Sequence, residues 1–155
     1  MELVRSAEYG YTERQRLIST LCEKYGFLKR KNIGRSCGGR DIYALKIGSA
    51  AEYSLIAAAF HGSEHITSVV LLMFIEELAD AVKSGGYLCG LNAARALKDR
   101  GVIFVPCVNP DGCEISINGI NACGELGSTV KRLCLGDFEH WNANLRGVDI
   151  NHNFN

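Results

Sequence analysis

The stretch YSLIAAAFHGSEH, residues 53–65, joins an unbroken apolar run to a short polar segment. The apolar part, residues 53–60, is typical of a strand that is buried on both faces of a mostly parallel sheet. His61 and Glu64 follow it directly, and functional side chains collect at the carboxyl ends of strands in open α/β sheets. An imidazole nitrogen and a carboxylate oxygen are both good zinc donors. The stretch therefore predicts a core strand that ends in a metal site.

Two potential ligands do not establish a metal site on their own. A catalytic zinc ion usually has three protein ligands and one open position, and a surface turn can carry a His and a Glu by chance. The three-residue offset aims both side chains at one point if the segment forms a tight turn, and Gly62 permits an unusual backbone conformation there. Both interpretations stay open until the surrounding motifs are considered.

The order of helices and strands predicted in the flanking segments is typical of an α/β layered domain. Apolar residues at helical spacing predict helices over residues 12–25, 67–82 and 92–99. The second of these is apolar nearly all round and is expected to be buried, with Gly85-Gly86 at its end. Strand patterns cover residues 41–48, 53–60, 102–106 and 148–150. Turn or loop composition covers residues 31–40, 109–112 and 113–132. Residues 1–155 contain no repeat or linker and are expected to form part of one domain.

Composition excludes several classes of function. The chain has 155 residues, with 17 basic and 17 acidic side chains, so a broad electrostatic surface for nucleic acid or anionic membrane is not expected. Glu76 and Glu77 interrupt the longest apolar stretch, which is too short and too charged to span a bilayer; both are expected at the wetter edge of a packed helix. The seven cysteines are scattered without a CxxC pair. Free thiols and the lack of a leader pattern at residues 1–5 favour a cytoplasmic location.

Three further motifs favour the interpretation of His61 and Glu64 as metal ligands over that of a chance pair. They are GRSCGGR at residues 34–40, VPCVNPDG at 105–112 and NLRGVDINHNF at 144–154. In this order, and with HGSE at 61–64, the chain resembles the carboxypeptidase A-like zinc peptidases from about Tyr11 to Asn155. Four ordered motifs are far more specific than any one of them. The resemblance implies a three-layer α/β/α domain with a mixed, largely parallel sheet.

The same resemblance implies roles for individual residues. His61 and Glu64 would bind one zinc ion, and Asn151 would help to hold a substrate carboxylate. Arg146 is the best candidate for the arginine that polarises the scissile carbonyl and stabilises the oxyanion. The implied reaction is attack on a peptide carbonyl by a water that zinc activates, with a glutamate as general base.

Two departures from the family pattern narrow the expectation. His152 stands where the digestive members of the family carry an arginine that binds the substrate carboxylate. The sequence of the last motif resembles the bacterial branch that cuts γ-D-glutamyl-meso-diaminopimelate bonds more than it resembles the digestive members. A peptidoglycan stem peptide is therefore the expected substrate. The family's third zinc-binding histidine and its general-base glutamate lie downstream of this motif, beyond Asn155. Residues 1–155 are thus expected to be the N-terminal part of the catalytic domain, with an incomplete sheet and no activity alone.

Alternatives remain at the level of sequence. His152 could be the third zinc ligand, although its motif position belongs to substrate binding. The chain could be a non-catalytic binding module or a pseudogene fragment derived from the peptidase, or a zinc amidohydrolase of small acylated amino acids. Cys107 and Cys113 are expected to be free buried thiols, with metal binding as the alternative. Asp149 is weighted toward a structural role, and Arg40 toward a solvated turn.

Overall fold

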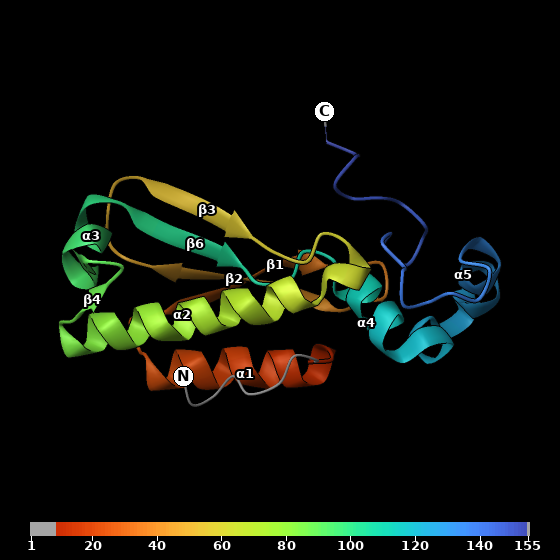
Figure 1. Cartoon of the computed structure of the whole chain (residues 1–155), viewed down its shortest axis with the longest axis horizontal. Helices are drawn as coiled ribbons and strands as arrows, with labels where there is room; N and C mark the ends of the chain where they lie inside the picture. Colours follow the sequence, from red (N-terminus) through yellow and green to blue (C-terminus); the bar gives the residue numbers. More distant parts are fainter. Residues whose placement is uncertain (1–8, 155) are drawn as a thin grey trace.

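The structure is a computed structural model that describes residues 9–154. Residues 1–5, on which the expectation about a leader rests, and Asn155 lie outside the described residues. Helices are α1 (Tyr11–Lys24), α2 (Ile66–Ser84), α3 (Ala93–Asp99), α4 (Pro110–Asn118) and α5 (Gly127–Leu133), with 3-10 turns η1 (Gly62–Glu64), η2 (Gly119–Ala122) and η3 (Gly124–Leu126). Strands are β1 (Lys29–Arg35), β2 (Asp41–Ile47), β3 (Tyr53–Ala57), β4 (Tyr87–Leu88), β5 (Leu91–Asn92) and β6 (Gly101–Val105). Figure 1 shows their arrangement.

The main sheet is mixed, as the family resemblance implied. Its four strands have the order β1-β2-β6-β3, in which β1 with β2 and β2 with β6 are antiparallel, whereas β3 with β6 is parallel. The carboxyl ends of β3 and β6 therefore meet at one edge, and the chain leaves both strands toward the same region (Figure 1). That edge carries His61 and the start of α4.

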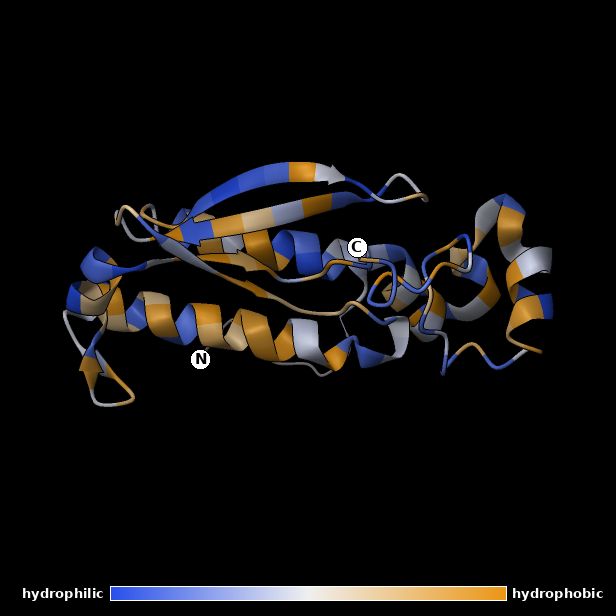
Figure 2. Cartoon of the chain, turned by 90° about the horizontal axis from the view of Figure 1, so that it is seen from above, coloured by the Kyte–Doolittle hydropathy of each residue, from blue (hydrophilic) through white to orange (hydrophobic). Residues whose placement is uncertain are grey.

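The main core lies between this sheet and two helices. Leu45 and Ile47 of β2 and Phe104 of β6 form one buried cluster with side chains of α1 and α2, so both helices pack on the same face of the sheet. Apolar residues recur along the whole length of α2 (Figure 2). Lys46, which points to the opposite face, is exposed. Within residues 9–154 the helical cover is thus on one side.

β3 differs from the sequence-based expectation of burial on both faces. Leu55 is 68% exposed, because it lies in register with Ile103 and Lys46 on the face that none of the described helices covers. Ile56 is on the other face but is 40% exposed, since β3 is the last strand in the sheet order. The strand also ends at Ala57 rather than at residue 60. An apolar run therefore forms an open sheet edge in the described part of the chain.

α2 has the expected position but is not buried all round. Leu72 and Ala79 are fully buried, whereas Val70 is 57% exposed. Glu76 corrects a second expectation, since its side chain is fully buried with Lys24 Nζ 3.5 Å from its Oε1, while Glu77 is exposed. None of the helices in the described part combines the length and the apolar character needed to span a bilayer.

Two segments predicted as turn or loop are regular structure. Residues 31–35 continue β1, whose seven residues are all exposed, so the strand lacks an apolar pattern; only residues 36–40 turn, where the Ser36 amide donates to the Arg40 carbonyl at 2.8 Å. Residues 113–132 lie mostly in α4, the 3-10 turns and α5. Residues 148–150, predicted as a strand, are irregular instead.

The NPDG motif is a helix start rather than a free turn. Asn109 is the N-cap of α4, and its Oδ1 accepts from the Gly112 amide at 2.9 Å. Pro110 occupies the first turn, where the absent N–H of proline has no intrahelical partner to lose. Asn, Pro and Asp suit both a turn and a capped helix, which explains the difference.

Candidate metal and substrate site

The loop after β3 is held by backbone contacts with the segment that follows β6. The amide of Ala58 donates to Val105 O, and the amides of Val108 and Asn109 donate to the carbonyls of Ala58 and Ala59, each at 2.9–3.0 Å. Ala59 has a φ of 53°, in the left-handed region that turns the chain sharply away from the strand. His61 therefore begins the η1 turn at a position fixed by two strands.

Gly62 lies where only a glycine fits. A Cβ at this position would come within 2.4 Å of the backbone oxygens of Gly112 and Trp141. The Gly62 amide also donates to Asn142 O at 3.2 Å. The loop that carries His61 is thus packed directly on the backbone of α4 and of the segment after α5.

Asn109 is 1% exposed, and its side chain forms hydrogen bonds with three segments of the chain. Its Nδ2 donates to Phe60 O at 3.0 Å and to Ala143 O at 3.1 Å, while its Oδ1 caps α4. A buried amide with its hydrogen-bonding capacity filled in this way fixes the relative positions of its partners. The ends of β3 and β6 and the 142–143 segment therefore form one support under the site.

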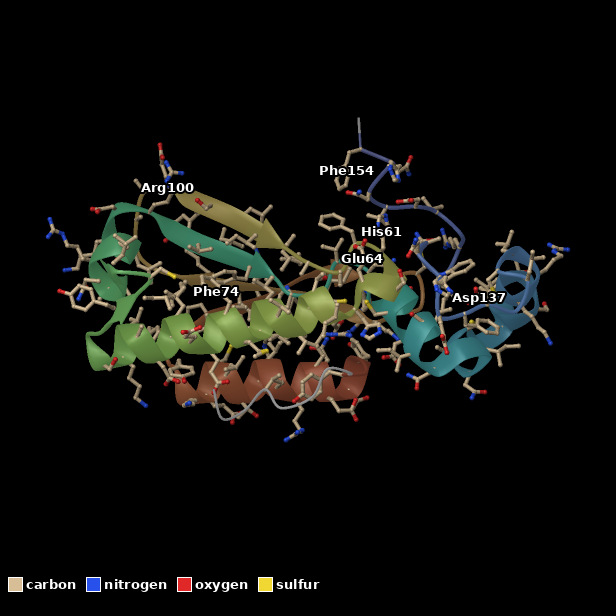
Figure 3. All side chains as sticks on the ribbon, in the orientation of Figure 1. His61, Glu64, Phe74, Arg100, Asp137 and Phe154 are labelled. Carbon is tan, nitrogen blue, oxygen red and sulfur yellow. The ribbon has the colours of Figure 1, made fainter. Side chains whose placement is uncertain are left out.

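His61 and Glu64 lie side by side at the start of α2 (Figure 3). His61 Nδ1 is 3.2 Å from Glu64 Oε1, and His61 Nε2 is 3.2 Å from Asp149 Oδ1. The hydrogen bond with Glu64 is the chief cause that raises the pKa of His61 above its ordinary value. An unprotonated ring nitrogen would be repelled by a carboxylate at this distance, so the contact requires a proton on Nδ1 in the absence of a cation; a metal ion held by both atoms would replace that proton.

Asp149 joins His61 to the end of the chain. Its Oδ1 accepts from the Asn151 amide at 3.0 Å, and its Oδ2 is 2.8 Å from His152 Nδ1. The bond with His152 is the chief cause that lowers the pKa of Asp149. The ligand atoms of His61, Asp149 and His152 all lie within 4.8 Å of one another. The structure therefore places a third potential donor, Asp149, beside the residues that the sequence identified.

Asp149 was expected to orient a neighbour or to cap a strand end, and residues 148–150 form no strand. Its separation from His61 is 88 residues, so no local spacing connects the two. The only sequence signal was its position in the GVDIN motif. The structure gives it a positioning role, because a carboxylate that accepts from one ring nitrogen of a histidine fixes the tautomer and orientation of that ring.

Arg146 and Asn151 are not drawn into the cluster. Both residues are exposed, and the Arg146 amide donates to Asn144 Oδ1 at 2.9 Å. Within residues 9–154 neither side chain makes a hydrogen bond or ion pair of its own. Of the five residues given metal, catalytic or substrate roles from the sequence, His61 contacts Glu64 directly and is linked to His152 through Asp149.

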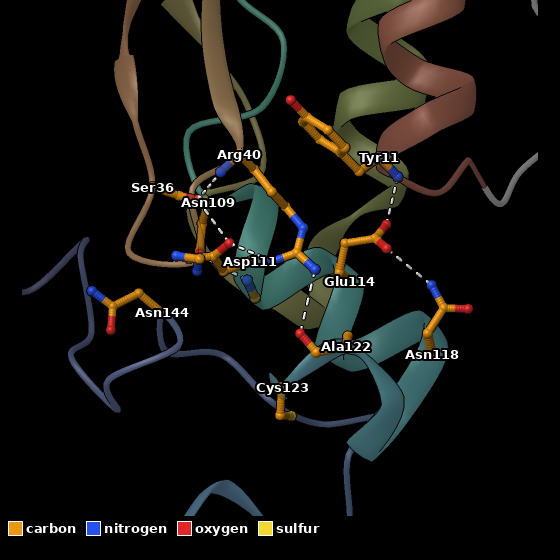
Figure 4. A network of polar contacts seen from close by, with 12 residues as sticks. Tyr11, Ser36, Arg40, Asn109, Asp111, Glu114, Asn118, Ala122, Cys123 and Asn144 are labelled. Carbon is orange, nitrogen blue, oxygen red and sulfur yellow. Dashed lines mark hydrogen bonds and ion pairs between the residues drawn. The ribbon is translucent and has the colours of Figure 1, made fainter. Parts of the chain in front are cut away.

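A buried polar network supports the site from the side of the β1–β2 turn (Figure 4). Asp111, with its side chain 1% exposed, accepts from Arg40 Nη1, from Ser36 Oγ and from the Gly38 amide, each at 2.7 Å. Arg40 is 18% exposed, which corrects the expectation of a solvated turn residue. The ion pair fixes the first turn of α4, on which the His61 loop packs.

Comparison with known proteins agrees with the motif order. A model of the zinc carboxypeptidase family matches residues 15–155. The uncharacterized protein YqgT of Bacillus subtilis is 31% identical over 150 residues, which cover 94% of this chain and 40% of that protein. Gamma-D-glutamyl-L-diamino acid endopeptidase 1 of Lysinibacillus sphaericus is 30% identical over 148 residues, covering 94% and 37%. The chain thus spans about two fifths of the length of these relatives.

Solved structures share the fold at lower identity. Bovine thrombin-activatable fibrinolysis inhibitor, solved in complex with tick carboxypeptidase inhibitor, superposes with a TM-score of 0.63 at 18% identity, covering 88% of this chain and 37% of that one. A metallo-carboxypeptidase from Burkholderia cenocepacia gives 0.60 at 18% identity, covering 93% and 32%. The α/β arrangement of the described residues is therefore that of part of a carboxypeptidase fold.

Proposed function

This chain belongs to the zinc carboxypeptidase family, and on that premise we propose that His61 and Glu64 are two ligands of one zinc ion. One observation carries the proposal: His61 Nδ1 and Glu64 Oε1 face each other at 3.2 Å, while Asp149 engages Nε2. Both facing atoms are suitable zinc donors. A carboxylate that accepts from the other ring nitrogen makes the ligating nitrogen more basic.

The proposed reaction is hydrolysis of a peptide bond. When bound, zinc lowers the pKa of water and polarises the substrate carbonyl. Asp149 holds the His61 ring with Nδ1 toward Glu64. Arg146 is proposed to stabilise the oxyanion, a task for which its planar guanidinium is suited. Asn151 and His152 are proposed to contact substrate.

The proposed substrate class is a peptidoglycan stem peptide, such as a γ-D-glutamyl-diaminopimelate unit. Two observations support it. The relative from Lysinibacillus sphaericus is named as an endopeptidase of γ-D-glutamyl-L-diamino acid bonds. In addition, position 152 holds a histidine bonded to Asp149, where an arginine would suit the binding of a free C-terminal carboxylate.

The third zinc ligand and the general base are proposed to come from outside residues 1–155, since the chain spans only 40% and 37% of the two relatives. The chain alone should then hold zinc weakly and hydrolyse peptides negligibly. An arrangement inside the chain competes with this proposal, because His61, Asp149 and His152 form a cluster of potential ligands. Loss of zinc on changing His152 would favour that cluster.

Zinc affinity, measured by competition with a chromophoric chelator, tests the proposal. Glu64→Gln should weaken binding by at least about 10-fold, and Asp149→Asn by about 10- to 100-fold through the orientation of His61. His140→Gln is the matched control, because the His140 side chain is 81% exposed and, among residues 9–154, is bonded only to Asp137. His152→Gln should leave affinity unchanged. Wild-type affinity in Glu64→Gln would contradict the assignment.

A further inference from the structure

Cys107 and Cys113 form a buried thiol pair beneath the site loop. Their sulfur atoms are 3.7 Å apart, and the residues are 7% and 0% exposed. Cys107 follows β6, Cys113 lies on α4, and Ala59 completes the small apolar cluster around them. The proposed zinc chemistry does not use either sulfur, so the pair has no assigned role.

The two sulfurs are chemically unequal. The hydrogen bond from Cys113 is the chief cause that lowers the pKa of Cys107, and the same bond together with burial raises the pKa of Cys113. A thiolate is the reactive form of cysteine. Cys107 is also the more exposed of the two, at 7% against 0%, so an oxidant reaches it first, and Cys113 is close enough to attack the Cys107 sulfur afterwards.

We propose that Cys107 and Cys113 are a reversible disulfide site that takes a small hydroperoxide as its oxidant. Geometry carries the proposal, because a disulfide has an S–S length of about 2.05 Å and the sulfurs already touch. Burial restricts the oxidant to a small neutral molecule, since a bulky disulfide reagent does not reach residues that are 7% and 0% exposed. Within residues 9–154 no other two cysteine sulfurs share a hydrogen bond.

The reaction balances in two steps. The Cys107 thiolate attacks the terminal oxygen of the hydroperoxide, so an S–O bond forms, the O–O bond breaks, and the other oxygen leaves as water or an alcohol after taking a proton. The sulfur of Cys113 then attacks the sulfenic acid on Cys107. An S–S bond forms, the S–O bond breaks, and hydroxide leaves with the Cys113 proton as water. Two thiols give up two electrons, and the peroxide bond accepts them.

The test uses the whole chain under native conditions with one equivalent of hydrogen peroxide. Remaining thiols are then alkylated in urea, and the tryptic peptide of residues 101–131 is sequenced by mass spectrometry. We expect a loss of two hydrogen atoms located between Cys107 and Cys113, reversed by dithiothreitol. Both thiols remaining open to alkylation after oxidation would overturn the proposal, and this wild-type result needs no variant to fold.

Variants sharpen the assignment. Cys113→Ser should abolish the disulfide and leave Cys107 at the sulfenic or sulfinic stage. Cys123→Ser is the matched control, because Cys123 is a buried cysteine in the same tryptic peptide; it should leave the disulfide unchanged. A linkage that disappears with Cys123, or one that forms only in urea, would show that the native pair is not the reacting site.

Discussion

Replacing Asp111 by Asn should destabilise the fold by about 3 kcal/mol, because breaking a buried ion pair from one side leaves the other charge uncompensated. Asp111 is 1% exposed and accepts from Ser36, Gly38 and Arg40 at 2.7 Å each. The Asn side chain carries no charge, and its NH2 group would face the hydrogen-bond donors that the Asp111 carboxylate now accepts from. The lower end of the range of about 3–5 kcal/mol applies, since Arg40 keeps a bond to Ala122 O at 3.3 Å. With a urea dependence of about 1.5 kcal/mol per M, the midpoint should fall by about 2 M.

A second Arg–Asp pair in the same hairpin is the control. Asp41 accepts from Arg35 Nε at 2.8 Å, but the Arg35 side chain is 72% exposed, so solvent screens the pair. Asp41→Asn should leave the urea midpoint nearly unchanged. If Asp111→Asn prevents folding altogether, Ser36→Ala should lower stability by about 1–2 kcal/mol through lost hydrogen bonds. Equal effects of Asp111→Asn and Asp41→Asn would refute the reasoning from burial.

Two other predictions concern packing and pH. Gly62→Ala places a methyl group 2.4 Å from two backbone oxygens and should lower stability in urea by about 1–3 kcal/mol, whereas Gly26→Ala, with open space around it, should have little effect. The 2.9 Å bond between His140 and Asp137 raises the pKa of His140 and lowers that of Asp137. The His140 contribution to stability is thus present at low pH and lost as pH rises through its raised pKa; that of Asp137 is lost as pH falls through its lowered pKa. In an NMR titration Asp137→Asn should return His140 to its ordinary value, and an unchanged midpoint would contradict the pairing.

Elements with a local signal were predicted from sequence within a few residues. The period of apolar residues located α1 and α2, and Gly85, with a φ of 68°, ends α2 as a left-handed C-cap should. Alternation located β2. β3 was located too, but its burial was wrong, because burial depends on the helical cover of each sheet face and on strand order. No pattern within residues 53–60 contains that order.

The NPDG segment and the residues after it show a different limit. Asn109 and Pro110 are common both in turns and at helix starts. The side-chain Nδ2 of Asn109 donates to Phe60 O and Ala143 O, and these bonds favour the helix start. Those carbonyls are 49 and 34 residues away in the sequence. The sequence of residues 109–112 therefore indicates a turn or a helix start, but it does not contain the distant carbonyls that decide between the two conformations.

In the candidate site, too, local spacing predicts one part of the geometry and distant residues decide the rest. The three-residue offset of His61 and Glu64 is local and was sufficient to place them together, as the 3.2 Å contact illustrates. The ring orientation of His61 is set from elsewhere, because Asp149 engages Nε2 and leaves Nδ1 toward Glu64. Asp149 is itself held by the amide of Asn151. The tautomer that would make His61 a ligand thus depends on Asp149, 88 residues downstream, so Asp149→Asn should alter metal affinity while leaving both proposed ligands in place.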